Sequence, residues 1–348
     1  MDKELEKRIV NCSRCGLCME VCPVYKVKKT ETSVSRGKFL QLLGLIRKEL
    51  KFDKRIKYNL DLCTNCDKCK KACPSDIDAV KIFASVICEY QSPLEEFLNS
   101  SFIFKLKIFC LKVMYKIKYP IGRKNFKKKP YLKTNEKIAH FNGCVTRAIN
   151  NGFEIPYKFE KENFVCCALP FYVKGRFNVY EKYKNRNIEL MKKYDKVVFD
   201  CAGCFNTVMN YEGVDKNKLV YFTDFYKNKS LYVENPVKIT FHKPCHLDED
   251  KFLEIEKILM NIEGVSYLRM NEYSDCCGFG GDFFTRHINT ASILSSRKIE
   301  NAAKTGSNIV LTTCPACLWS LKFGIKTKNI GIKAYDLADF LHNFVNLK

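Results

Sequence analysis

Two cysteine runs dominate the N-terminal part of the chain. They are Cys12-Ser-Arg-Cys15-Gly-Leu-Cys18-Met-Glu-Val-Cys22-Pro23 and Cys63-Thr-Asn-Cys66-Asp-Lys-Cys69-Lys-Lys-Ala-Cys73-Pro74. Both follow the spacing C-x2-C-x2-C-x3-C-P. This spacing is typical of bacterial-type ferredoxins, in which three close thiolates and one distant thiolate hold a cubane iron-sulfur cluster. We therefore expect two [4Fe-4S] cubanes and a role in electron transfer.

The fourth cysteine of each run is expected to reach the cluster of the other run. This swapped ligation assigns one cubane to Cys12, Cys15, Cys18 and Cys73, and the other to Cys63, Cys66, Cys69 and Cys22. Structural zinc is the alternative, but it needs two pairs of ligands and leaves the third close cysteine and the proline of each run unexplained.

Composition supports a metal-binding function. The chain has 348 residues, of which 20 are cysteine, and its start, MDKELEKRIV, shows no apolar signal segment. We therefore expect thiols that bind metal in a reducing cytoplasm rather than disulfides. The net charge of +22 could attract an anionic partner, an anionic substrate, nucleic acid or a membrane. The lysines are spread along the whole chain, however, and we expect no nucleic-acid partner.

The pattern of apolar residues divides the chain into four parts. Residues 1–95 are expected to form a helical ferredoxin-type domain, because the segment Ser35–Ile46 between the runs has helical periodicity. Residues 96–135 form a basic amphipathic helix and linker, with no acidic residue from Phe102 to Lys133. That segment can lie on an anionic membrane surface, pack on the protein itself, or meet an acidic partner. We expect two α/β domains at 136–232 and 233–348.

The C-terminal half shows short apolar runs of the kind that form buried parallel strands, and a cysteine follows each of them. Ligands of open α/β sheets bind at the carboxyl ends of strands. The fold class is therefore expected to be α/β, with two Rossmann-like domains in tandem after the helical domain. The four cysteines at the predicted strand ends are Cys144, Cys201, Cys245 and Cys314.

These cysteines belong to two repeated sets of five. The first set is Cys144, Cys166, Cys167, Cys201 and Cys204; the second set is Cys245, Cys276, Cys277, Cys314 and Cys317. Five thiols are one more than a cubane or a zinc ion requires. An adjacent pair of cysteines suits neighbouring irons of an open cluster better than one tetrahedral metal.

The order Cys, Cys-Cys-Gly, Cys-x-x-Cys resembles the CCG-domain iron-sulfur proteins. These include the catalytic subunits of heterodisulfide reductase and the iron-sulfur subunits of glycolate oxidase and anaerobic glycerol-3-phosphate dehydrogenase. The resemblance is carried by the segments at residues 242–247, 276–281 and 314–317. It implies one or two noncubane [4Fe-4S] clusters, with a substrate disulfide cleaved between the two sets. The first set departs from the pattern at Ala168, and it could instead hold a cubane, a zinc ion or nothing.

The resemblance and the intact second motif direct the catalytic prediction to the second set. We expect chemistry at Cys276 and Cys277, with Gly278, Gly280 and Gly281 allowing the backbone to approach the cofactor closely. His246 could supply a proton or a hydrogen bond to cluster sulfur, although a structural role is equally open.

Three hypotheses for function follow. The first is a heterodisulfide-reductase-like subunit that reduces a small-molecule disulfide, or acts on a thiol, with electrons from a flavoprotein, a hydrogenase, a formate dehydrogenase or a membrane cytochrome. The second is an electron-relay subunit of a flavin-dependent hydroxy-acid or glycerol-3-phosphate dehydrogenase. The third is a non-catalytic assembly or maturation factor for iron-sulfur clusters. We expect a cytoplasmic protein, with peripheral contact to the inner face of the membrane as an option.

Overall fold

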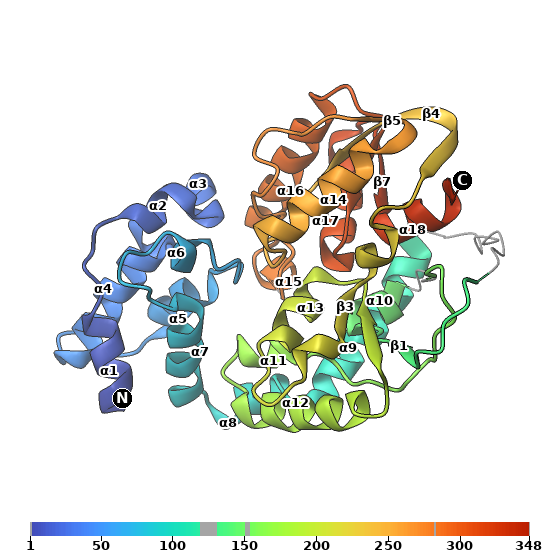
Figure 1. Cartoon of the computed structure of the whole chain (residues 1–348). Helices are drawn as coiled ribbons and strands as arrows, with labels where there is room; N and C mark the ends of the chain where they lie inside the picture. The colour runs from blue at the N-terminus through green and yellow to red at the C-terminus, as the bar shows by residue number, and fades with distance from the viewer. Residues whose placement is uncertain (1, 119–130, 150–153, 282, 348) are drawn as a thin grey trace.

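The computed structural model of the chain describes residues 2–118, 131–149, 154–281 and 283–347. It shows a helical N-terminal part beside two α/β parts (Figure 1). The α/β fold class predicted from the sequence is therefore confirmed, with parallel pairing in both sheets. No helix among the described residues is long and apolar enough to cross a membrane.

The N-terminal part consists of short helices around a small apolar core. Pro23 occupies the first turn of α3, where its missing N–H costs nothing, and Asp53 caps α5 by accepting from the N–H groups of Arg55 and Ile56. The helix predicted between the runs is α4, which buries Phe39 and Leu42 against α7. The elements are α1 Lys3–Val10, α2 Leu17–Val21, α3 Pro23–Lys28, η1 Glu31–Ser33, α4 Ser35–Ile46, α5 Lys54–Asp61, α6 Lys68–Lys71 and α7 Ala79–Glu89.

A pair of helices links this part to the first α/β part. A capping box between Ser92 and Glu95 starts α8 (Pro93–Leu98), and α9 follows at Ser101–Lys118. The predicted basic helix is thus present, whereas residues 119–130 of the predicted basic linker lie outside the described residues.

The first α/β part has a three-stranded parallel sheet in the order β1-β2-β3. The predicted strands before Cys144 and Cys201 correspond to β1 and β2. The elements are β1 Ile138–His140, α10 Cys144–Ile149, α11 Leu169–Tyr172, α12 Phe177–Met191, β2 Lys196–Phe199, α13 Ala202–Met209, η2 Lys216–Lys218, β3 Leu219–Tyr221 and η3 Phe222–Tyr226.

The second α/β part has the parallel order β5-β4-β6-β7, and β8 pairs antiparallel with β4. One apolar cluster runs through both α/β parts, from Val197 in the first sheet to Ile239 and Phe340 in the second part. The elements are β4 Leu231–Phe241, α14 Glu249–Met260, β5 Ile262–Tyr267, α15 Phe283–Arg286, α16 Ile288–Ala303, β6 Ile309–Thr312, α17 Pro315–Lys328, β7 Lys333–Asp336, α18 Leu337–Asn343 and β8 Val345–Leu347.

The cysteines stand where strands end and helices begin. Cys144 is the first residue of α10, Cys201 is the N-cap of α13, and Cys314 is the N-cap of α17. Cys245 is followed by a turn instead. Free N–H groups at such helix starts favour negative charge, and this arrangement suits thiolates and anionic clusters.

Candidate iron-sulfur centres

The two ferredoxin runs exchange their last cysteines in space. One small cavity is lined by Cys12, Cys15, Cys18 and Cys73, and also by Cys69. Cys22 lies within electrostatic range of Cys63 and Cys66, and so does Cys69. This is the grouping that swapped ligation requires, and the ligation itself stays a prediction.

The two ferredoxin groups differ in their surroundings. Cys15 is exposed, and the backbone N–H of Leu17 helps to lower the pKa of its thiol. Cys66 is buried. Burial also raises the pKa of Cys22 to about 12, and the charge of Lys38 opposes that rise. Lys38 is 2% exposed, and its ammonium group donates to the Leu62 carbonyl at 2.8 Å. A buried cation therefore lies beside the group of Cys22, Cys63, Cys66 and Cys69, which we call the inner group.

The second set of five cysteines is assembled in one place. The sulfur atoms of Cys277 and Cys317 lie 3.2 Å apart. The thiol of Cys276 interacts with those of Cys245 and Cys277, and the thiol of Cys314 interacts with that of Cys317. The Gly278 N–H donates to the Cys276 sulfur at 3.3 Å, from a backbone with φ +82° that favours glycine.

The first set is assembled as well, despite its alanine. The Cys166 sulfur lies 3.5 Å from that of Cys144, and the Cys167 thiol interacts with those of Cys166 and Cys204. Ala168 keeps the left-handed conformation of Gly278, with φ +64°, and its side chain is fully buried. The predicted departure at Ala168 therefore leaves the backbone path unchanged, and the residue carries the strain of a left-handed alanine.

Two supporting residues of the first set were missed from the sequence. The Tyr211 hydroxyl donates to the Cys167 carbonyl at 2.8 Å, and the Asn187 side-chain amide donates to the Cys166 carbonyl at 3.2 Å. Both side chains are buried, and both fix the adjacent cysteine pair. Only their burial in the fold identifies them, because Tyr and Asn follow no motif at these positions.

Electrostatic interactions between thiols link the three groups of cysteines. Cys66 of the second ferredoxin run interacts with Cys245 of the second set. Cys314 of the second set interacts with Cys201 of the first. The second set therefore lies between the ferredoxin part and the first set.

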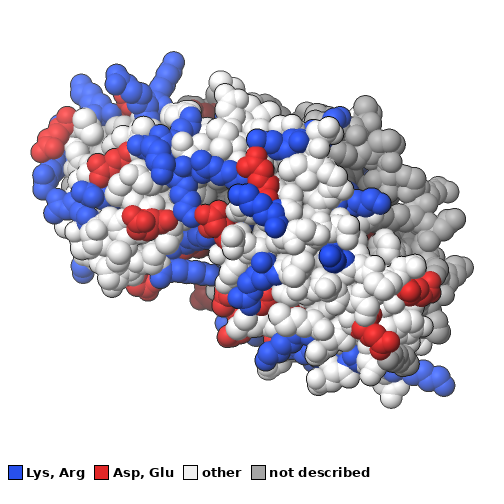
Figure 2. All heavy atoms as spheres, turned by 90° about the horizontal axis from the view of Figure 1, so that it is seen from above, with Lys and Arg blue, Asp and Glu red and all other residues white. Residues whose placement is uncertain are grey.

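Ion pairs lie at the junction between the ferredoxin part and the second set. Asp275, which precedes Cys276, accepts from Lys26 at 2.8 Å and from Lys68 at 2.5 Å. Burial alone would raise the pKa of Asp275, but these two hydrogen bonds outweigh it and hold the pKa below its ordinary value. Figure 2 shows Lys and Arg gathered over the N-terminal helical part and over its junction with the rest of the molecule, with Asp and Glu among them.

The predicted glycines and His246 lie at this junction. A methyl group on Gly280 would come within 2.6 Å of the Thr64 carbonyl oxygen, so this glycine allows close packing against the ferredoxin run. Gly281 lies beside Asn65 of the same run. His246 directs Nε2 toward Asp67, 4.0 Å from its carboxylate, while its backbone follows Cys245.

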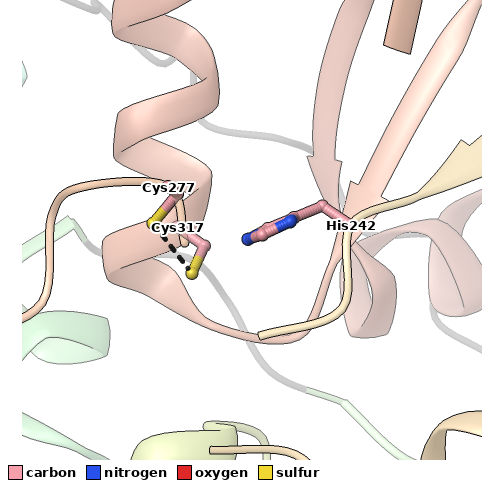
Figure 3. A group of neighbouring side chains, drawn as sticks. All are labelled: His242, Cys277 and Cys317. Atoms are coloured by element: carbon pink, nitrogen blue, oxygen red, sulfur yellow. Dashed lines mark hydrogen bonds between the residues drawn. The ribbon is translucent and has the colours of Figure 1, made fainter. Parts of the chain in front are cut away.

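A histidine that was not predicted as a site residue lies inside the second set. His242 follows β4, is fully buried, and lies with the sulfurs of Cys277 and Cys317 in a group whose atoms are within 4.8 Å of one another (Figure 3). Burial lowers the pKa of His242 to about 3, and Lys298 contributes to the lowering, so the ring is neutral at pH 7. Its position three residues before Cys245, at the end of a predicted strand, is the sequence signal that could have identified it.

Comparison with known proteins agrees with this geometry. The family described as a cysteine-rich domain (CCG) matches residues 135–209 and 239–322, and the family described as a 4Fe-4S dicluster domain matches residues 8–77. The fold and the three groups of cysteines define an iron-sulfur protein with [4Fe-4S] clusters. The chain belongs to the CCG-domain iron-sulfur proteins that carry an N-terminal dicluster domain.

Curated relatives cover nearly the whole chain at low identity. A subunit of the fumarate reductase (CoM/CoB) of Methanothermobacter marburgensis is 26% identical, over 98% of this chain and 73% of its own length. A subunit of the dihydromethanophenazine:CoB–CoM heterodisulfide reductase of Methanosarcina barkeri is 23% identical, over 97% and 94%. The probable glycolate oxidase iron-sulfur subunit of Bacillus subtilis is 22% identical over the same shares. These relatives are subunits of oxidoreductases.

A solved structure shows the same overall fold. The crystal structure of a hypothetical protein from Helicobacter pylori aligns with a TM-score of 0.54 over 98% of this chain and 73% of its own, at 8% identity. At that identity the likeness concerns the fold alone.

Proposed function

We propose that the chain is an oxidoreductase subunit that takes electrons from a partner protein, passes them through two cubanes to the second set, and there reduces a small-molecule disulfide to two thiols. The carrying observation is the series of thiols that interact electrostatically, from Cys66 to Cys245 and from Cys314 to Cys201. Each disulfide takes up two electrons, supplied one at a time, and two protons.

The surroundings of the cysteines support this direction of electron transfer. Exposed Cys15 makes the first ferredoxin group the natural contact for a partner, and the inner group adjoins the second set. A noncubane cluster bound there would supply one-electron chemistry. Cys276 and Cys277 would hold it, and His246, next to Cys245, would carry a proton for a departing thiolate. The twenty free cysteines suit a reducing, cytoplasmic setting.

One substitution tests the catalytic assignment. Cys277→Ser should abolish the paramagnetic signal that a thiol substrate induces in the oxidised protein, and should leave the signals of the cubanes unchanged. Cys88→Ser is the matched control, because Cys88 is exposed and lies outside all three groups. If Cys277→Ser keeps both the thiol-induced signal and turnover, the second set is not the reaction site, and the relay or assembly function becomes the better account.

An apolar cavity favours a second candidate function, electron relay to an apolar acceptor. The cavity has a volume of about 570 Å³, within the range of about 300–1,000 Å³ that small-molecule sites occupy. It lies between α9 and both cysteine sets, with Cys144 and Ala316 in its wall, and five of its lining side chains are aromatic: Phe104, Phe171, Phe279, Phe284 and Trp319. Such a lining suits a flat, apolar ring system.

The outer face of α9 supports a membrane origin for such a molecule. Phe102, Leu106, Phe109 and Val113 follow one another at helical spacing and are 68%, 50%, 61% and 41% exposed. Leu106 also lines the cavity, so the exposed apolar stripe reaches its mouth. Because Phe102 to Lys133 contains many lysines and one arginine but no acidic residue, an anionic lipid surface is the matching partner.

Two measurements test this second candidate. Menadione, an apolar naphthoquinone, should bind the purified protein in equilibrium dialysis, and Ile103→Trp, which fills the cavity from α9, should weaken binding at least tenfold, whereas the exposed control Ile293→Trp should not. Binding to anionic vesicles should fall steeply between 0.1 M and 1 M salt, as the Debye length shrinks from about 10 Å to about 3 Å. Absence of menadione binding, or equal binding to neutral and anionic vesicles, would count against the relay to a membrane-borne acceptor.

A further inference from the structure

The buried side chain of His242 lacks a hydrogen-bond partner. The residue is fully buried, and neither ring nitrogen makes a hydrogen bond at normal geometry. A buried polar group without a partner costs about 1–3 kcal/mol. Such a group in a folded protein therefore points to a bound ligand or ion, and Figure 3 shows this imidazole directed toward Cys277 and Cys317.

The three side chains have the composition and spacing of a metal site. Ligands at about 2.0–2.3 Å from one tetrahedral ion lie roughly 3.3–3.8 Å from each other. The two sulfurs are 3.2 Å apart, and all three ligand atoms are within 4.8 Å of one another, so small side-chain movements bring them onto one iron.

The internal repeat shows that this histidine belongs to the second set alone. Phe141 stands three residues before Cys144, as His242 stands three residues before Cys245. The Phe141 N–H donates to the Val198 carbonyl of the neighbouring strand at 2.9 Å, and the His242 N–H donates to the Leu311 carbonyl at 2.8 Å. The two residues therefore occupy the same place in the two repeats, and a fully buried phenylalanine fills it in the first.

From these observations we infer that His242 is a nitrogen ligand of the iron held by Cys277 and Cys317. The inference rests on the proposed cluster in the second set and deepens it, because it makes this cluster chemically different from any in the first set. His242 is a neutral ligand, so it adds no negative charge to that of the five cysteines, whereas a cysteine at this position would add one. In iron-sulfur proteins an imidazole in place of a thiolate raises the reduction potential. The second set would then accept electrons more readily than a cluster with cysteine at position 242.

Pulsed electron paramagnetic resonance on the full-length, anaerobically purified protein tests this ligand. With ¹⁵N-labelled histidine, the thiol-induced signal of the second set should show the strong nitrogen coupling of a directly bound imidazole. His242→Phe should remove the coupling and should still fold, because Phe141 fits the equivalent position. His246→Phe, the matched control beside Cys245, should keep it.

Iron analysis separates the outcomes. A wild-type protein with only the roughly eight irons of two cubanes would overturn the proposed cluster and this ligand together. Full iron content without nitrogen coupling, or with coupling that survives His242→Phe, would overturn the ligand alone. If His242→Phe loses the iron of the second set, His242→Cys should restore that iron without nitrogen coupling and with a lowered potential. Failure to restore it would show that His242 has a packing role.

Discussion

Adding one methyl group at Gly280 tests whether electrons cross the junction between the second ferredoxin run and the second set. Gly280 packs directly on Thr64, and the Cβ of Gly280→Ala would stand 2.6 Å from the Thr64 carbonyl oxygen, where ordinary contacts begin at 3.4 Å. The junction must therefore open by about 0.8 Å, or the backbone must bend. Gly280 does not have a positive φ, so the clash is the only direct effect of the substitution.

The size of the effect follows from the cost of overpacking. Adding a methyl group to a close-packed contact costs typically about 1–3 kcal/mol. At about 1.4 kcal/mol per factor of ten, this lowers the population of the closed junction by roughly 5- to 150-fold. If electrons cross from Cys66 to Cys245, reduction of the second set should slow markedly, while the cubanes should be reduced at the normal rate.

Stopped-flow reduction with dithionite measures both steps. Gly331→Ala is the matched control, because this exposed glycine has open space around it and no positive φ. The expected result is full iron content in both variants and slow reduction of the second set in Gly280→Ala alone. Reduction of the second set at the wild-type rate in Gly280→Ala would refute the electron path through this junction.

Three more predictions concern backbone strain, a buried charge and an ion pair. Gly278→Ala should destabilise the protein by about 2–4 kcal/mol, because the backbone has a left-handed φ and the new Cβ would lie only 2.9 Å from Leu294. Ala168→Gly should change stability by less than about 1 kcal/mol, because the relief of strain is offset by lost methyl burial and added chain entropy. Anaerobic thermal unfolding compares the two variants. Lys38→Met should lower the potential of the inner cubane, by roughly 40 mV for each 1 kcal/mol of lost attraction, in a redox titration. Asp275→Asn should weaken the junction by about 1–3 kcal/mol, seen as faster hydrogen exchange there. Because the folded-state pKa of Asp275 is lowered, its contribution in the wild type is present above about pH 3.9 and is lost as the pH falls through the folded pKa.

The elements that the sequence predicted are those with strong local signals. The segment Ser35–Ile46 has a helical period and became α4, and the buried runs before Cys201 and Cys314 became β2 and β6. Strand β5 was missed, because it carries Gly264 with φ +83° and an alternation of exposed polar residues that is weak for a parallel strand. The short β8 was missed as well, since its pairing with β4 depends on tertiary contact rather than on its own three residues.

The membership of the candidate sites could be predicted, but their order in space could not. Cysteine spacing groups the ligands because each run is local and its geometry is set by the chain. The contact of Cys66 with Cys245 depends on how the helical part docks, and that docking rests on ion pairs and glycine contacts between distant segments. His242 was missed for the same reason, since its partners Cys277 and Cys317 come from two other segments.

The two repeats share one backbone plan but differ at each position that touches a different neighbour. The second set adjoins the ferredoxin part, where Gly280 allows the close approach, and the buried His242 lies with the sulfurs of Cys277 and Cys317. The first set adjoins α9 and the apolar cavity, through Cys144. On the proposed path, electrons from the ferredoxin part meet the second set first, and the cavity borders both sets, so the differences have a common explanation. We infer that the second repeat is adapted to receive electrons and that a substrate would meet them at the boundary between the repeats.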